Sequence, residues 1–157
     1  ESMRIDSSGN VGINNSSPSS YNSDGRNLVV GSGSGGQGLS IASGTSSYGT
    51  IYFADGTSGD ALYRGSVLYN HASDFMRFDT AANERMRIDS SGNVGIGTSS
   101  LNNYSGYNAL TINGTNGGVV DFKANGTDIG SIYGTSALFQ VQAQGTTIPI
   151  TFRTNSA

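Results

Sequence analysis

The chain repeats itself, and this repeat constrains its fold more than any other feature of the sequence. Residues 1–13 recur at residues 84–96 with a single difference. Further along, three later segments match in the same order, namely 28–30 with 110–112, 49–52 with 130–133, and 76–80 with 150–154. The offset between matching segments falls from 83 to 82 and then 81 residues along the chain, as single-residue deletions in turns would produce, and it is 74 for the last pair. Tandem repeats are typical of arrays in which each unit packs on its neighbours. We therefore divide the chain into two tandem units, 1–83 and 84–157, and expect it to be part of a longer array.

The composition favours short strands joined by tight turns. Gly, Ser, Asn and Thr make up about half of the 157 residues, and Leu, Ile, Val and Phe only about a fifth. Such a chain would bury a thin core by itself, which argues against an ordinary enzyme domain. A net charge of −3 together with eight Tyr and six Phe argues against disorder.

Several protein classes are excluded or disfavoured on the same grounds. No apolar run is long enough for a transmembrane helix, and the absence of Cys excludes a disulfide scaffold. Eleven acidic against eight basic residues, with a pI near 4.8, disfavour nucleic-acid binding. We expect neither membrane insertion nor a nucleic-acid partner.

The repeated segment predicts a β-hairpin. Residues 85–88 and 93–96 alternate polar and apolar side chains, so each has one apolar face. Residues 89–92 between them form a turn, because an Asp side chain accepts local backbone hydrogen bonds and Gly adopts a positive φ. Gly95 lies between two apolar positions and predicts close approach of another backbone. The four positions expected to face a core are Met86, Ile88, Val94 and Ile96.

Other strands follow turn signals of the same kind. Residues 119–124 and 129–133 flank an Asn-Gly turn and predict a second hairpin. Residues 138–142 and 148–152 predict two more strands. The sequence therefore predicts six or seven short strands in each unit and no helix.

A lone unit would bury too little surface to offset its chain entropy. We expect three identical chains to share one narrow core and to pair their edge strands, which would otherwise be open to water. The predicted fold class is therefore all-β: an elongated trimeric fibre of short antiparallel strands and hairpins, intertwined around a three-fold axis.

Residues 84–98, with the sequence ERMRIDSSGNVGIGT, resemble a repeat found in tail-fibre and receptor-binding proteins of tailed bacteriophages, cyanophages in particular. Phe78, or Phe152 with residues 153–155, also resembles the strand that leads into this motif. The resemblance implies a trimeric β-structured shaft in the virion tail fibre, which projects a receptor-binding tip for host attachment. It implies as partners two further copies of the chain, other virion tail proteins, and a host receptor or glycan reached through the parent fibre.

Two other functions stay open at this point. The repeats could bind cell-surface glycan themselves, through loops that differ between the units, such as residues 53–75. The chain could also belong to a tandem-repeat surface fibre or adhesin of a cell, because related strings occur in bacterial surface proteins. Glycan hydrolysis by paired carboxylates is disfavoured, since the chain has no Trp and hardly any Glu.

Four motifs could indicate a binding or catalytic site, and for each of them a purely structural role is the better interpretation. Residues 31–36 fit G-x-G-x-x-G, but a strand-like segment at 37–41 follows where a dinucleotide site needs a helix. Residues 89–93 and 55–60 are faintly like calcium loops but carry too few carboxylates. His71 is the only His, and it has no counterpart in the second unit. The sequence predicts no catalytic, cofactor-binding or metal-binding residues, and no cofactor.

Three sets of surface residues have both a structural and a functional interpretation. Glu84, Arg85, Arg87 and Asp89 form either an exposed ion-pair ladder or contacts that fix strand register between chains. Four tyrosines could pack across strands or stack on sugars: Tyr21, Tyr48, Tyr104 and Tyr107. Five asparagines match the N-x-[ST] pattern, as expected in a chain of this composition: Asn14, Asn15, Asn103, Asn113 and Asn125.

Overall fold

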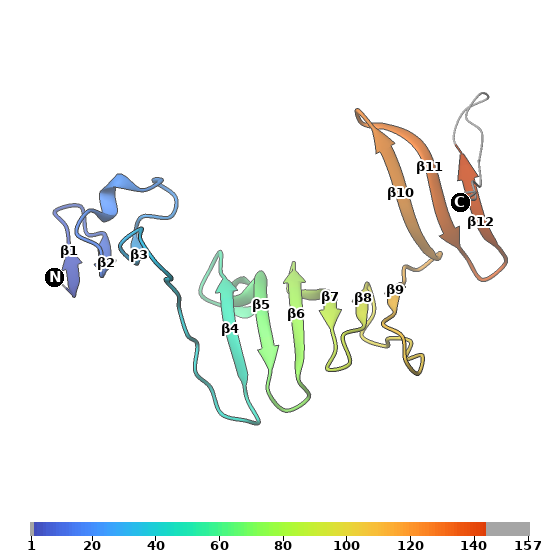
Figure 1. Ribbon diagram of the computed structural model, residues 1–157, viewed down its shortest axis with the longest axis horizontal. Helices are drawn as coiled ribbons and strands as arrows, with labels where there is room; N and C mark the ends of the chain where they lie inside the picture. Colours follow the sequence, from blue (N-terminus) through green and yellow to red (C-terminus); the bar gives the residue numbers. More distant parts are fainter. Residues whose placement is uncertain (1, 144–157) are drawn as a thin grey trace, which may run out of the picture. The chain divides into compact units, whose positions relative to one another are not determined.

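The structure is a computed structural model, and it describes residues 2–143. This part of the chain contains twelve short β-strands and two 3₁₀ helices, η1 (Pro18–Ser20) and η2 (Gly59–Tyr63), and no α-helix (Figure 1). The prediction of an all-β chain is confirmed. The strand predicted at 148–152 lies outside the described residues.

The chain divides into two compact units, Glu1–Ala42 and Ser43–Ala157. These compact units differ from the sequence repeats 1–83 and 84–157. The repeat boundary falls at the first residues of one strand, β7 (Asn83–Ile88), which pairs with the strand before it. A single sheet therefore runs from the first sequence repeat into the second.

The first compact unit holds a three-stranded sheet in the order β1-β2-β3. Its strands are β1 (Met3–Ile5), β2 (Val11–Ile13) and β3 (Leu28–Val30). The pair β1–β2 is antiparallel, whereas β2–β3 is parallel.

The second compact unit holds a six-stranded sheet in the order β4-β5-β6-β7-β8-β9. Besides β7, its strands are β4 (Tyr48–Phe53), β5 (Gly65–Asn70), β6 (Phe75–Thr80), β8 (Val94–Ile96) and β9 (Leu110–Ile112). Each pair from β4 to β8 is antiparallel, and β8–β9 is parallel. The hairpin predicted around the turn at 89–92 is confirmed as β7–β8.

The same compact unit contains a second, three-stranded sheet of β10 (Gly118–Ala124), β11 (Thr127–Gly134) and β12 (Phe139–Ala143). Asn125 and Gly126 connect β10 to β11 with φ angles of 49° and 80°. Positive φ at both central residues is the geometry that favours Asn-Gly in a two-residue hairpin turn. This second predicted hairpin is also confirmed.

The sequence repeat is a structural repeat, because β7-β8-β9 has the pairing of β1-β2-β3. Met86 lies opposite Ile96 just as Met3 lies opposite Ile13. The prediction of antiparallel strands alone is wrong for β2–β3 and β8–β9. In both copies a crossover of more than ten residues returns the chain to the same end of the sheet, so the third strand enters parallel.

Gly95 is required because the backbone after β8 folds back against it. A Cβ at Gly95 would lie 2.6 Å from the Thr98 carbonyl oxygen and 2.9 Å from Leu101 Cδ1. In the first copy a Cβ at Gly12 would collide with the Asn15 carbonyl oxygen in the same way. The close backbone approach predicted at Gly95 is confirmed, and Gly12 has the same contact in the first copy.

Candidate functional site

One face of the six-stranded sheet is a continuous apolar surface. The strand register aligns one apolar residue from every strand in a row across the sheet: Ile51, Val67, Phe78, Met86, Ile96 and Ile112. A second row lies beside it on the same face: Tyr69, Met76, Ile88, Val94 and Leu110. We call these two rows the apolar face of this sheet.

The apolar face is only partly covered within the described chain: seven of its eleven side chains are half-buried, and Gly118 of β10 lies against Ile112. Ile51, Ile96 and Leu110 are 45%, 40% and 61% exposed, and no member of either row is buried. Within residues 2–143 the buried hydrophobic side chains are only Val29 and Leu68, and both lie outside the two rows. The positions predicted to face a core thus share one face, as expected, but a single chain gives that face no core.

Each of the other two sheets has a similar face of its own. In the sheet β1-β2-β3 the register aligns Met3 with Ile13 and Val30, and Ile5 with Val11 and Leu28. In the sheet β10-β11-β12 it aligns Val120 with Ile132 and Val141. Most of these residues are exposed, and none is buried. The uncovered apolar face is therefore a property of every sheet described.

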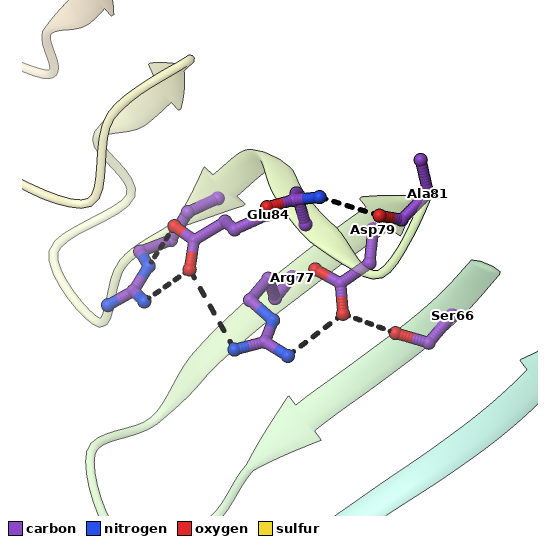
Figure 2. A network of polar contacts seen from close by, with 7 residues as sticks. Ser66, Arg77, Asp79, Ala81 and Glu84 are labelled. Carbon is purple, nitrogen blue, oxygen red and sulfur yellow. Dashed lines mark hydrogen bonds and ion pairs between the residues drawn. The ribbon is translucent and has the colours of Figure 1, made fainter. Parts of the chain in front are cut away.

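The opposite face of the six-stranded sheet is polar and more deeply buried. Figure 2 shows its central network, which begins at Ser66, where the hydroxyl donates a 2.5 Å hydrogen bond to Asp79 Oδ2. Arg77 Nη2 lies 2.8 Å from the same oxygen, and Arg77 Nη1 lies 3.9 Å from Glu84 Oε2. Glu84 accepts two hydrogen bonds from Arg87, at 2.9 and 2.7 Å. The more deeply buried side of the sheet thus holds this polar network together with Leu68, and both apolar rows lie on the more open side.

The four charged residues of the repeated hairpin, for which an exposed ladder and contacts between chains were both open, lie in different surroundings. Glu84 and Arg87 form an ion pair in which each side chain is only 19% exposed, and the Arg87 guanidinium lies 3.9 Å from the centre of the Phe75 ring. Arg85 instead donates to the Thr80 hydroxyl, and Asp89 belongs to the adjacent turn. The interpretation as an exposed ladder therefore does not hold for Glu84 and Arg87, and contacts between chains stay a prediction.

Sequence reasoning missed Arg77 and Asp79. Asp79 has a side chain that is 7% exposed, and its Oδ1 atom has no hydrogen-bond partner within the described residues. Alternation indicates that Arg77 and Asp79, two residues apart on β6, share one face. No signal in the sequence places Glu84 with them, because alternation alone would place Glu84 on the face of Met86. The register shift between Phe78 and Asp79 sets Glu84 opposite Asp79.

An Asp and an Asn close the turn after β7, and the same contacts recur after β1. Asp89 Oδ1 accepts hydrogen bonds from the backbone N–H of Ser91 and of Asn93, each at 2.9 Å, and Asp89 Oδ2 accepts one from Asn93 Nδ2 at 3.0 Å. In the first copy Asp6 and Asn10 form the corresponding side-chain contact at 2.9 Å. We call this arrangement the Asp–Asn clasp.

The clasp also explains why the turn is so strongly conserved between the two copies. Asn93 is completely buried, and its Oδ1 accepts a 2.8 Å hydrogen bond from the backbone N–H of Ala109, just before β9. The hydrogen bond from Asn93 is the main cause that lowers the pKa of Asp89, and Asn10 lowers the pKa of Asp6 in the same way. A calcium ion would have to displace these donors from both carboxylate oxygens, and no cluster of three potential metal ligands occurs in residues 2–143.

The remaining motifs are not brought together into a site. No helix follows residues 31–36 in the described chain, and 37–41 form no strand, so the strand expected there is absent. Asp55 lies 3.7 Å from Arg64, while Asp60 accepts a hydrogen bond from Tyr63. His71 packs edge-on against Tyr69, with 4.9 Å between ring centroids.

Neither the exposed tyrosines nor the N-x-[ST] asparagines gather at one site in the described chain. Tyr21, Tyr48, Tyr104 and Tyr107 are 45%, 57%, 58% and 76% exposed. Tyr104 and Tyr107 form one isolated β-bridge with each other. The side chain of Asn15 is held by Gly31 O at 2.7 Å and Asn125 forms a hairpin turn, so both asparagines have structural roles.

Comparison with protein-family models and with curated proteins finds no match for this chain. Among the described residues no helix has the length and apolar character needed to span a membrane. The function is therefore inferred from the surfaces described above and from the repeated motif.

Proposed function

We propose that the chain is a shaft segment of a homotrimeric fibre, of the kind that bacteriophage tails use to project a receptor-binding tip toward a host. Three copies would place the apolar faces of their sheets toward a common axis and exclude water from them. The repeat at residues 84–98 and its resemblance to phage fibre motifs support this function. The proposed location is the virion tail fibre, with other tail proteins as partners.

One observation carries the proposal: each described sheet has rows of apolar side chains on one face, and no member of these rows is buried. An exposed contiguous apolar surface of this extent marks an interaction site in a soluble protein. A second and a third copy of the same chain offer matching rows, because the register repeats from one unit to the next. Self-association therefore covers the face without any other partner.

The mechanism that follows is mechanical. Each repeat contributes a sheet whose hairpin is closed by an Asp–Asn clasp, and the next repeat continues the array along the chain. The shaft would hold the tip away from the virion and transmit contact to the tail. No bond is made or broken in this role.

The length of engineered arrays tests this function. Chains with one, two and three copies of the 83-residue unit would be imaged by negative-stain electron microscopy. We expect the particle length to rise by a constant increment at constant width. A particle that grows in every dimension would contradict a shaft.

Glycan binding by the repeats is the second candidate, and a polar hollow favours it. The hollow encloses about 440 Å³ and is lined in part by Phe75, Arg87, Asp89 and Asn103, a mixture of aromatic and polar groups suited to a sugar. Reproducible binding of the assembled chain on a glycan array would favour this function.

The third candidate, a cellular surface fibre, would use the same apolar faces, and the full sequence of the parent chain distinguishes it from a viral fibre.

A further inference from the structure

The outer edge of β4 is open to another strand. Among the described strands β4 pairs with β5 alone, and Figure 1 shows it as the first strand of its sheet. On the β5 side, the His71 backbone N–H donates to Ser47 O at 3.1 Å. Backbone groups of successive residues point to alternate sides of a strand. The N–H and C=O groups of Thr50 and Tyr52 therefore point to the open edge.

This edge has none of the usual protection against pairing. β4 contains no charged residue and no Pro, and its pairing with β5 has no bulge. Its side chains are also exposed: Tyr48 at 57%, Ile51 at 45%, Tyr52 at 58% and Phe53 at 61%. An exposed apolar edge strand of six residues is a template for a further strand.

The second repeat shows what occupies the corresponding edge. Residues 49–52 of β4 match residues 130–133 of β11, and β11 pairs with a strand on both sides. On one side lies β12, which corresponds to β5. On the other side lies β10, with Val120 opposite Ile132 and Phe122 opposite Gly130. The edge of β4 is therefore the position that β10 fills in the second repeat.

The first repeat contains a segment with the pattern of β10 that forms no strand of its own. Leu39 and Ile41 lie at the same spacing before β4 as Val120 and Phe122 do before the matching part of β11. In the structure residues 38–42 have no regular pairing, and Leu39 and Ile41 are 69% and 45% exposed. The described chain thus contains an unpaired segment with the pattern of a strand, residues 38–42, and an unpaired strand edge, that of β4.

We propose that residues 38–42 of a neighbouring copy add to the outer edge of β4 as an antiparallel strand. The register of β10 on β11 places Leu39 opposite Ile51 and Ile41 opposite Gly49. Leu39 then extends the apolar row that begins at Ile51. The proposal rests on the proposed function, because the fibre supplies the neighbouring copy.

Exchange between copies follows from the position of this segment. Ala42 ends one compact unit and Ser43 begins the next, so the segment lies at the junction where an element can be exchanged. Exchange of an identical element between protomers links copies at little cost. In a three-fold assembly each copy would give its segment to the next, and the exchange closes on itself.

Disulfide trapping tests the proposal, and the natural chain helps because it has no Cys. Leu39→Cys with Ile51→Cys joins two residues that would form a non-hydrogen-bonded pair, with Cα atoms about 4.5 Å apart, a separation that a disulfide spans. After mild oxidation we expect non-reducing electrophoresis to show a band at three times the chain mass. The matched control is Ser40→Cys with Ile51→Cys, whose side chains would point to opposite faces, and it should give no such band.

Each outcome decides the proposal. A disulfide within one chain overturns exchange between copies, and a trimer that forms no disulfide overturns strand addition while leaving the shaft function standing. A protein that is monomeric before oxidation overturns both. Hydrogen exchange of the unmodified protein gives a second measurement: the Thr50 and Tyr52 amides should be protected in the assembly, and rapid exchange at both would contradict an added strand.

Discussion

At the scale of single residues, the Asp–Asn clasp shows how a five-residue turn sets the position of two strands. Asp89 binds the backbone of its own turn, and the fully buried Asn93 binds both Asp89 and the backbone before β9. The clasp therefore links the hairpin to the parallel strand that follows. Its recurrence at Asp6 and Asn10 makes it part of the repeat.

Asn93→Ala should destabilise the protein by about 2 kcal/mol. The change leaves Asp89 Oδ2 and the Ala109 N–H without this side-chain partner, and an unsatisfied buried polar group costs about 1–3 kcal/mol. Urea unfolding at fixed protein concentration measures the loss. Ser91→Ala is the control, because the hydrogen bonds described for Ser91 come from its backbone, and it should change the free energy of unfolding by less than about 0.5 kcal/mol. Equal effects of the two substitutions would contradict the role of the clasp.

The clasp also predicts how stability depends on pH. The pKa values of Asp6 and Asp89 are lowered in the folded chain, mainly by the side-chain hydrogen bonds from Asn10 and Asn93. The resulting stabilisation is present above the unfolded pKa of about 3.9 and is lost as the pH falls through the lower, folded value. Urea unfolding should show a free energy that declines below about pH 4, with a smaller decline in the double variant Asp6→Asn, Asp89→Asn. The same slope in both proteins would contradict the assignment.

At the scale of elements, the parallel third strand defines the repeated unit. In both copies the chain leaves the second strand, folds back against a glycine and returns parallel to it. Gly95 is the contact point, because the backbone at Thr98 occupies the space that a side chain would need.

Gly95→Ala should therefore cost about 1–3 kcal/mol, as expected when a methyl group is forced into a packed contact. Gly25→Ala is the matched control, since a Cβ there would meet nothing within 4 Å. Thermal unfolding of the two variants compares them directly. A stability for Gly95→Ala equal to that of the control would mean that the crossover does not pack against β8.

The hairpins could be predicted from sequence and the crossovers could not. Turn residues at 89–92 and 125–126 lie between alternating segments, so local chemistry determines β7–β8 and β10–β11. The parallel pairs join residues more than ten positions apart, and no local signal gives their direction. For the clasp, the sequence predicted that the Asp side chain accepts hydrogen bonds in the turn. It did not predict the burial of Asn93, because that burial depends on the crossover before β9. The burial of Glu84 and Arg87 likewise depends on Arg77 and Phe75, which lie on a neighbouring strand.

At the scale of the whole molecule, every described sheet has apolar rows of which no member is buried, and within residues 2–143 the buried hydrophobic side chains are only Val29 and Leu68. No member of the rows through Phe78 and Met76 is buried, while the buried positions on β5 are Ser66, Leu68 and Asn70. In the proposed fibre, contact between copies would bury these rows and add hydrophobic stabilisation that a single chain lacks.

Ile96→Asp should abolish assembly. Ile96 is 40% exposed in the single chain, where a charged side chain could still reach water, but between packed copies the carboxylate would be buried without a partner. Tyr107→Asp is the control, because Tyr107 is 76% exposed and lies outside both rows. Size-exclusion chromatography of each variant measures assembly. Ile96→Asp should elute later than the natural chain, as a smaller species, and the control should elute like the natural chain. Assembly of Ile96→Asp at natural strength would exclude this face as the interface.

The mass of the natural chain in solution tests the central claim most directly, namely that copies of this chain cover its apolar faces. Sedimentation equilibrium over a range of protein concentrations measures that mass without reference to shape. The account predicts a single species at three times the 16.1 kDa of one chain. A folded species of 16.1 kDa that unfolds cooperatively at every concentration would contradict it.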